Sequence, residues 1–478
     1  MVDLKENMAR GLLWGILNNG MMQILTAIIG IFTTRLLSPS DYGVVAVVAV
    51  FTSVASCLQE SGFTVALTNM DNPQDRDYNS VFWFNLLVSI SLYIALFFST
   101  PLIAMYFHEP VLRKVSRIIF ITIILNGLGT VPAAYMFKNM MVKENTILRT
   151  IAMISSGLVG VGLAFVGFSY WSLVWQQITY VLIISIGRFF LITWKPSFYI
   201  DFGPVCRMFS FSYKILITSI ITVLNQNFLT FVFGRVFPMS VVGNFNQANK
   251  WNGMASSFIS GTVAQVAQPV FVAVNDDSNR QIRVFRKMLR FTAFLAFPAM
   301  FGLAIVAKEF IYITITSKWA ACIPILQILC ISGSFLPFYT LYQNLIMSKA
   351  KSGIYMWCTL LQIIFQILLI LLTYRDGIIF MISVNTIFSI FWLSIWQWQA
   401  HRLVCLRLCD VLKDIMPFFI VSAVVMGTVY ILTMPITNLI VLLVSRILLA
   451  AVFYAGIMKI SHAVIFDECV RYFMKKRR

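Results

Sequence analysis

Charged residues are scarce in this sequence. Of its 478 residues only 11% are Asp, Glu, Lys or Arg, whereas 59% are hydrophobic. A chain of this length with so few charges cannot cover a globular surface with polar groups. This composition excludes a cytosolic globular enzyme and indicates a membrane protein.

Side chains that catalyse reactions or bind metals are also sparse. The three histidines fall in unrelated segments: His108, His401 and His462. The acids of the expected outer loops are widely separated: Asp41, Glu109, Glu309 and Asp376. The eight cysteines are scattered, which fits neither a disulfide framework nor a metal cluster. We therefore predict no catalytic residue, no metal site and no cofactor, and we do not expect an enzyme.

Long apolar stretches are what the sequence has instead. About fourteen of them, each of membrane-spanning length, run from Gly11 to Lys459 with short polar breaks, which predicts an all-α polytopic membrane protein. The expected spans are 11–34, 43–68, 80–105, 118–137, 147–168, 170–192, 209–235, 241–272, 291–307, 321–347, 353–373, 378–399, 415–433 and 437–458. The eighth and tenth are long enough to tilt or kink. The first is too long for the apolar region of a signal peptide, so we expect it to stay in the mature chain.

The net charge of +18 falls mainly on one side of these spans. If the N-terminus is inside, the outer side carries only Arg35, Arg113, Lys114, Arg117, Arg235, Lys308, Lys318 and Arg375. Because cytoplasmic loops are rich in Lys and Arg, both termini are expected in the cytoplasm. The basic segments Arg280–Lys287 and Lys475–Arg478 then enforce topology and touch anionic lipid, and no nucleic-acid partner is expected.

An internal repeat divides the chain. Arg35 and Gly43, eight residues apart after the first span, have counterparts in Arg235 and Gly243 after the seventh. Six spans separate the copies, so the repeat is parallel, with a pseudo-twofold axis along the membrane normal. We predict lobes at 1–200 (spans 1–6) and 201–400 (spans 7–12) around a central cavity, followed by a terminal helix pair and a basic tail at 401–478.

Several motifs resemble a known family. They are Leu36–Gly43, the run Gly243–Trp251, Gln268-Pro269, Phe297-Pro298 and Ser317-Lys318-Trp319. In order and spacing they are similar to the polysaccharide-biosynthesis flippases, closest to the Wzx-type oligosaccharide flippases (the WzxC-like branch) of the multidrug/oligosaccharidyl-lipid/polysaccharide exporter superfamily. The resemblance covers essentially the whole chain.

This resemblance implies an alternating-access transporter in the bacterial inner membrane. The implied cargo is an undecaprenyl-pyrophosphate-linked oligosaccharide, moved from the cytoplasmic to the periplasmic leaflet while its lipid tail stays in the bilayer. Other implied partners are bilayer lipid, Na⁺ or H⁺ as a coupling ion, and the polysaccharide polymerase and export machinery. A diphosphate and sugar hydroxyls need fixed charges and hydrogen-bond partners to cross hydrocarbon, which requires a polar, cationic cavity.

Lys250 is the first candidate to bind the pyrophosphate. It lies about two helical turns past Gly243 within the eighth span, with polar or aromatic neighbours. An intramembrane cation costs roughly 2.5–3.5 kcal/mol on insertion scales and so should face a wet cavity or an anion, unless it snorkels to the outer interface. The neighbours expected to contact substrate are Gln247, Asn249 and Trp251, the last of which either packs a sugar ring or anchors the helix at the interface.

Three arginines are further candidates for substrate binding. Arg35 and Arg235 occupy equivalent positions in the repeat and either clamp the diphosphate or anchor helix ends among lipid headgroups. Arg446 lies near the middle of the last span. It either touches the lipid phosphate or forms an internal pair or carbonyl contact.

Glu60 is the candidate for ion coupling. It is the only carboxylate within the expected spans, although a place toward the cytoplasmic side also allows it to be solvated or paired with Arg10 or Arg76. Amides in the first and seventh spans are expected to face the central cavity or to join helices: Asn18, Asn19, Gln23, Asn225, Gln226 and Asn227.

Two other functions remain as alternatives. A cation-coupled multidrug exporter of the same superfamily would need a more apolar, acid-lined cavity, and the excess of Lys and Arg argues against it. A membrane polysaccharide polymerase or ligase would need a large periplasmic loop with catalytic residues, and no expected outer loop exceeds roughly a dozen residues.

Overall fold

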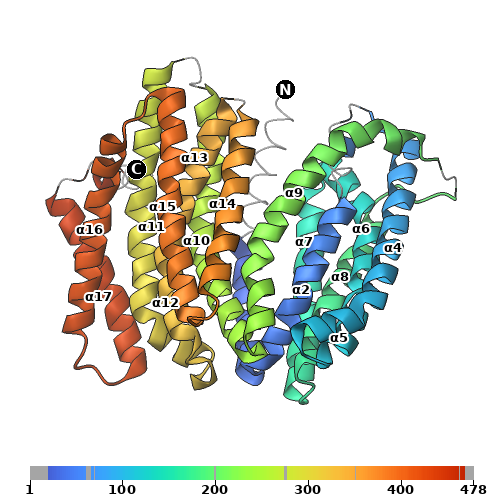
Figure 1. Ribbon diagram of the computed structural model, residues 1–478, viewed down its shortest axis with the longest axis horizontal. Coiled ribbons are helices and arrows are strands. Elements are labelled where there is room, and N and C mark those ends of the chain that lie inside the picture. The colour runs from blue at the N-terminus through green and yellow to red at the C-terminus, as the bar shows by residue number, and fades with distance from the viewer. Residues whose placement is uncertain are drawn as a thin grey trace. The chain divides into compact units, whose positions relative to one another are not determined.

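The computed structural model describes residues 20–60, 66–68, 70, 72–198, 201–273, 277–349, 351–461, 463 and 465–468. Over these residues the regular secondary structure is entirely helical, which confirms the all-α fold class (Figure 1). Asn18 and Asn19 lie outside the described residues.

Eleven helices in the described part are long and apolar enough to cross a membrane, and Gly20–Leu36 is a shorter apolar helix. Helices α9 (Gly203–Val236) and α10 (Met239–Ala273) are also of spanning length, at 34 and 35 residues. Each expected span overlaps a helix. The count of fourteen crossings stays a prediction.

The chain forms two compact units, residues 1–246 and 247–478, so that the division falls within α10. The lobes predicted from the repeat at 1–200, 201–400 and 401–478 stay a prediction. Besides the helix Gly20–Leu36, α9 and the start of α10, the first unit contains α2 (Pro39–Glu60), α4 (Asp75–Phe107), α5 (Val111–Ile119), α6 (Ile121–Lys138), α7 (Val142–Phe165) and α8 (Tyr170–Leu191). The second contains the rest of α10 and α11 (Ser278–Thr314), the 3₁₀ turn η1 (Ser317–Trp319), α12 (Cys322–Gly333), α13 (Leu336–Ser348), α14 (Ser352–Thr373), α15 (Ile378–Val404), α16 (Leu408–Leu432) and α17 (Leu439–Ile460).

Two helices of the second unit differ from the expected spans. The tenth span is broken into α12 and α13 around Ser334, just before Pro337, because proline cannot donate a backbone hydrogen bond in a helix interior. Helix α11 is longer than the ninth span and continues to Thr314, since no glycine or proline interrupts it after Gly302. The outer-loop assignment of Glu309 was therefore wrong, because Glu309 lies within the helix.

Small residues set the helix spacing in the first unit. A methyl group added at Gly127 of α6 would lie 2.0 Å from Ser89 Oγ of α4, and one at Gly129 would lie 2.7 Å from Ser185 Oγ of α8. Gln59 of α2 donates to Ser89 Oγ (2.7 Å) in the same contact. Close approach over small residues with polar links is typical of membrane helices, where burial of apolar surface from water does not drive association.

The two copies of the sequence repeat are in direct contact. A Cβ added at Gly43 of α2 would lie 1.9 Å from the carbonyl oxygen of Met239, and one at Gly243 of α10 would lie 1.8 Å from that of Pro39. Each carbonyl belongs to the residue four positions before the other glycine, so the contact is symmetric. Only residues without a side chain permit two helix backbones to approach so closely.

Asp41 fixes the start of α2 beside this crossing. Its Oδ2 accepts from the backbone N (2.9 Å) and Oγ (2.6 Å) of Ser38, whose Oγ accepts from the Asp41 backbone N (3.3 Å). This reciprocal pair is a capping box. The other carboxylate oxygen accepts from the Tyr170 backbone N (3.1 Å) and from the Ser169 hydroxyl. Asp41 therefore joins the crossing to the start of α8.

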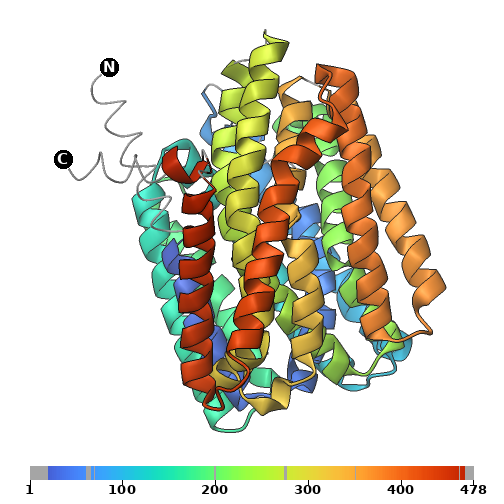
Figure 2. The same cartoon turned by 90° about the vertical axis from the view of Figure 1, so that its left-hand side faces the viewer.

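An aromatic cluster forms much of the core of the second unit. Phe297 of α11 is fully buried and lies with its ring centroid within 6 Å of those of four neighbours. These neighbours are Phe301, Phe335, Phe338 and Phe419. Helices α11, α16 and α17 lie side by side in both views (Figures 1 and 2). The terminal helices α16 and α17 therefore pack on α11.

The glycine crossing predicts a position-specific effect on stability. Gly243→Ala should destabilise the protein by about 1–3 kcal/mol or prevent its folding, because the added methyl group overlaps the Pro39 carbonyl. Gly253→Ala is the matched control on the same helix, where no atom lies within 4 Å of an added Cβ. Thermal unfolding of both variants in detergent checks this. Equal melting temperatures for the two variants would contradict the close contact.

Candidate functional site

Helix α10 carries a row of polar and small residues along one side. Asn249, Lys250, Ser257 and Gly261 recur along this side at helical spacing and are exposed or half-buried. Among the described residues, no heavy atom lies within 4 Å of a Cβ added at Gly253 or Gly261, so there is open space beside these two glycines. A polar helix face of this kind is costly against lipid and therefore calls for water or a polar ligand.

Lys250 has no partner in the part of the chain that the structure describes. Neither a hydrogen bond nor an ion pair reaches its ammonium group there, and the side chain is only partly exposed. Burial without an anion is costly for a charged group, so Lys250 is poised to gain from one. The role in pyrophosphate binding stays a prediction.

The opposite side of α10 packs against its own unit. Trp251 is 7% exposed and meets Phe310 of α11 edge to face, with ring centroids 4.9 Å apart. Gln247 is fully buried, and a methyl group at Gly333 of α12 would lie 2.2 Å from Asn252 Oδ1. Trp251 therefore serves as a packing residue in this structure, and its predicted contact with a sugar stays a prediction.

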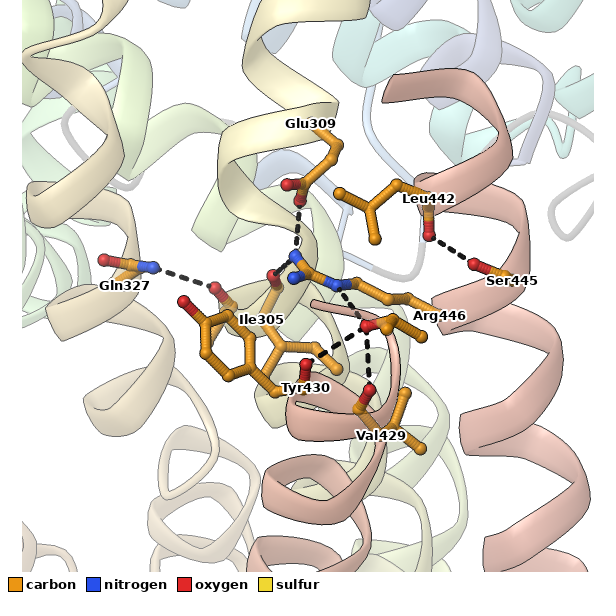
Figure 3. Close-up of polar contacts among 10 residues, drawn as sticks. Ile305, Glu309, Gln327, Val429, Tyr430, Leu442, Ser445 and Arg446 are labelled. Carbon is orange, nitrogen blue, oxygen red and sulfur yellow. Dashed lines mark hydrogen bonds and ion pairs between the residues drawn. The ribbon is translucent and has the colours of Figure 1, made fainter. Parts of the chain in front are cut away.

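Arg446 forms a buried ion pair with Glu309. Its Nη1 donates to Glu309 Oε2 (2.8 Å) and to the Ile305 carbonyl (2.8 Å), and its Nε donates to Thr433 Oγ1 (3.1 Å) (Figure 3). The guanidinium also stacks on the Tyr430 ring, 4.7 Å from the centroid. The internal pair considered from the sequence is thus confirmed, and a contact with lipid phosphate stays a prediction.

This pair corrects one inference from the sequence. Glu60 was taken as the only carboxylate within the spans, but Glu309 is 2% exposed inside the spanning helix α11. Glu60 itself ends α2, and its side chain lies outside the described residues. The role of Glu60 in ion coupling stays a prediction.

The two arginines of the repeat lie at helix ends. Arg235 contacts the His108 ring and lies over the Tyr106 ring, with its Cζ 5.1 Å from the centroid, so that it fastens the end of α9 to the end of α4. Arg35 is exposed near the end of the helix Gly20–Leu36. Their predicted contact with diphosphate is untested by these positions.

The remaining candidates lie in the first unit. Gln23 is half-buried in the helix Gly20–Leu36. In α9, Asn225 and Asn227 are half-buried and Gln226 is exposed, and Asn227 Nδ2 donates to the Val223 carbonyl (2.9 Å) within its own helix. Their expected place in a central cavity stays a prediction.

Part of the basic segment at the start of α11 is paired within the protein. Arg286 binds Asp414 of α16 through two hydrogen bonds (2.6 and 3.2 Å), and Arg290 lies 3.2 Å from the same carboxylate. Lys287 pairs with Glu468 (2.7 Å). These residues join α11 to the C-terminal part of the chain, a role that the sequence analysis missed because the acids are more than a hundred residues away.

Comparison with known families identifies the chain. The family model described as "Polysaccharide biosynthesis protein" matches residues 32–324, more than half of the sequence. The chain belongs to this polysaccharide biosynthesis family. The family predicted from the motifs is therefore confirmed.

Two relatives of this chain agree with this assignment. The chain is 24% identical over 361 residues to the lipopolysaccharide biosynthesis protein WzxC of Escherichia coli strain K12, covering 74% of this chain and 72% of WzxC. It is 24% identical over 333 residues to the succinoglycan biosynthesis transport protein ExoT of Rhizobium meliloti strain 1021, covering 69% and 66%.

Its fold matches a solved structure over nearly the whole length. The structure titled lipid II flippase MurJ, inward closed conformation, superposes with a TM-score of 0.77 at 17% identity, covering 98% of this chain and 100% of that one. The chain therefore shares the fold of that structure.

The Arg446–Glu309 pair predicts a double-mutant cycle. Arg446→Leu and Glu309→Leu should each destabilise the protein by about 3–5 kcal/mol, because each leaves one charge buried without its partner. The double variant should regain most of this loss, since two leucines leave no charge unpaired.

Thermal unfolding in detergent measures the cycle. Arg375→Ala is the control, because Arg375 is exposed and contacts its own neighbour Tyr374. Additive single effects in the double variant would show that the two charges are not coupled.

Proposed function

We propose that this protein is a flippase that moves an undecaprenyl-pyrophosphate-linked oligosaccharide from the cytoplasmic to the periplasmic leaflet by alternating access, without covalent chemistry. It would serve the biosynthesis of a surface polysaccharide such as O-antigen, capsule or exopolysaccharide. Family membership supports this role, as do relatives named for lipopolysaccharide biosynthesis and succinoglycan transport.

The observation that carries the proposal is the polar row of α10 with Lys250. Arg446, Arg286 and Arg290 are neutralised by carboxylates within their unit, whereas Lys250 has no partner in the described part of the chain. A diphosphate supplies the missing anion, and sugar hydroxyls match the neighbouring Asn249 and Ser257. This arrangement favours an anionic, hydroxyl-rich cargo over a cationic drug.

Alternating access assigns a role to the glycine crossing. With the N-terminus inside, Gly43 and Gly243 belong to the outer ends of α2 and α10. In the proposed cycle, this contact would part when the oligosaccharide is released to the periplasmic leaflet. Because the crossing relies on backbone contact between glycines, it can part without unpairing buried charges.

The coupling ion and protein partners belong to the same proposal. Na⁺ or H⁺ would drive the cycle, with Glu60 as the candidate ligand, and the polymerase and export machinery would receive the product. We place the chain in the bacterial inner membrane with both termini in the cytoplasm, because Lys and Arg are concentrated on that side.

Lys250 gives the direct test of the proposed function. In cells depleted of the protein, lipid-linked oligosaccharide should accumulate on the cytoplasmic leaflet, and wild type should restore its display outside. Lys250→Ala should lower the transport rate by about tenfold or more, because a charge-assisted contact with pyrophosphate is lost, and Lys250→Arg should retain most of it. Leaflet sidedness is measured by accessibility of the glycan to an external lectin.

Lys459→Ala is the control, since Lys459 is exposed at the end of α17. Protein levels must match in all strains. If the lipid-linked oligosaccharide were displayed normally outside after depletion, the flippase proposal would be refuted and the drug exporter would be favoured. Full activity of Lys250→Ala would refute the lysine site alone.

The proposed topology has its own test. A fluorescent protein fused after Arg478 should fluoresce, and alkaline phosphatase fused there should be inactive, because both report a cytoplasmic location. The reverse pair of results would invert the topology and with it the assignment of the outer ends.

A further inference from the structure

A pocket separate from the α10 face opens between α14 and α15. It encloses about 530 Å³ and is lined by the start of α14 and the last turns of α15, with Trp357 and Trp398 among its walls. Its lining is predominantly apolar, and Cys358 and Leu361 contribute to it.

Lys351 is among the residues that line this pocket, and Arg402 contacts one of the lining side chains, Trp398. Lys351 is exposed, and no hydrogen bond or ion pair reaches its ammonium group within the part of the chain that the structure describes. Arg402 is also exposed, and its guanidinium stacks on the Trp398 ring, 3.8 Å from the centroid. Stacking holds the guanidinium by its face and leaves its N–H edge available to a phosphate. One exposed cation thus belongs to the lining, and a second lies against a lining tryptophan.

The apolar part of the pocket continues along α14 toward the bilayer interior. Leu361 lies in the pocket with 42% of its surface exposed. Ile364 and Leu368 follow it at helical spacing, with 57% and 50% of their surfaces exposed. This row makes a track for a hydrocarbon chain that begins at the pocket. Trp at such a boundary is typical of the level of lipid headgroups.

From this arrangement we infer that the pocket between α14 and α15 binds an anionic glycerophospholipid, with its phosphate between Lys351 and Arg402 and an acyl chain along the α14 row. The positive side of the chain is the expected cytoplasmic side, where anionic lipids bind to basic pockets between helices. A soluble anion would leave the apolar walls and the track unused, and a zwitterionic lipid would place its own cation near Arg402.

The inference is independent of the transport cycle and is tested by binding. The purified full chain in detergent is titrated with palmitoyl-oleoyl-phosphatidylglycerol, and bound lipid is counted by native mass spectrometry. Lys351→Ala with Arg402→Ala should weaken binding roughly thirtyfold, because each cation near the surface contributes about fivefold. Phosphatidylcholine and inorganic phosphate should bind weakly and should not displace the lipid.

A second variant blocks the pocket while leaving both cations in place. Gly353 lines the pocket and has no atom within 4 Å of an added Cβ, so Gly353→Leu should fill the space and also abolish tight binding. Gly427→Leu is the control, because Gly427 of α16 also has open space around it. Arg407→Ala with Lys413→Ala, both exposed, is the charge-matched control.

The expected result is loss of phosphatidylglycerol in both pocket variants and retention in both controls. Equal loss in the charge-matched control would reduce the effect to general surface charge and overturn the inference. Displacement by inorganic phosphate would make the pocket a site for a soluble anion. Unchanged binding in Gly353→Leu would show that the lipid lies elsewhere.

Discussion

The backbone crossing at Gly43 and Gly243 is the constraint on which the arrangement of the repeat depends. Each glycine lies against the carbonyl of the residue four positions before the other, so a side chain at either position would push the helices apart. Asp41 holds the start of α2 by a capping box and joins it to the start of α8. The crossing therefore depends on the absence of a side chain at both glycines as well as on the capping contacts of Asp41.

Three arginines of the second unit are neutralised by carboxylates of the same unit. Arg446 is buried beside Glu309, and Arg286 and Arg290 share Asp414, so helices α11, α16 and α17 are joined by compensated charges. Because an uncompensated charge is costly in hydrocarbon, this pairing is what allows arginine inside the bundle. Lys250, which is only partly exposed, lacks such a partner in the described part of the chain.

Sequence reasoning succeeded where the information is local. Apolar length predicted the helices, and the spacing from Arg35 to Gly43 identified its counterpart from Arg235 to Gly243. It failed where partners are distant. Glu309 was assigned to a loop because the preceding apolar stretch ends near residue 307, but the helix continues and its carboxylate is held by a residue 137 positions later. Trp251 was expected either to contact a sugar or to anchor the helix at the interface. Neither expectation included its packing against Phe310.

The sequence by itself determined that this chain is a helical membrane protein with a duplicated element, because hydropathy, charge bias and short motifs are properties of neighbouring residues. Only the tertiary structure decided that the duplicated glycines touch, that Arg446 is neutralised, and that open space lies beside Gly253 and Gly261 of α10. Whether a polar group is paired depends on side chains that the fold brings together from distant helices. A local sequence pattern therefore cannot predict such pairs.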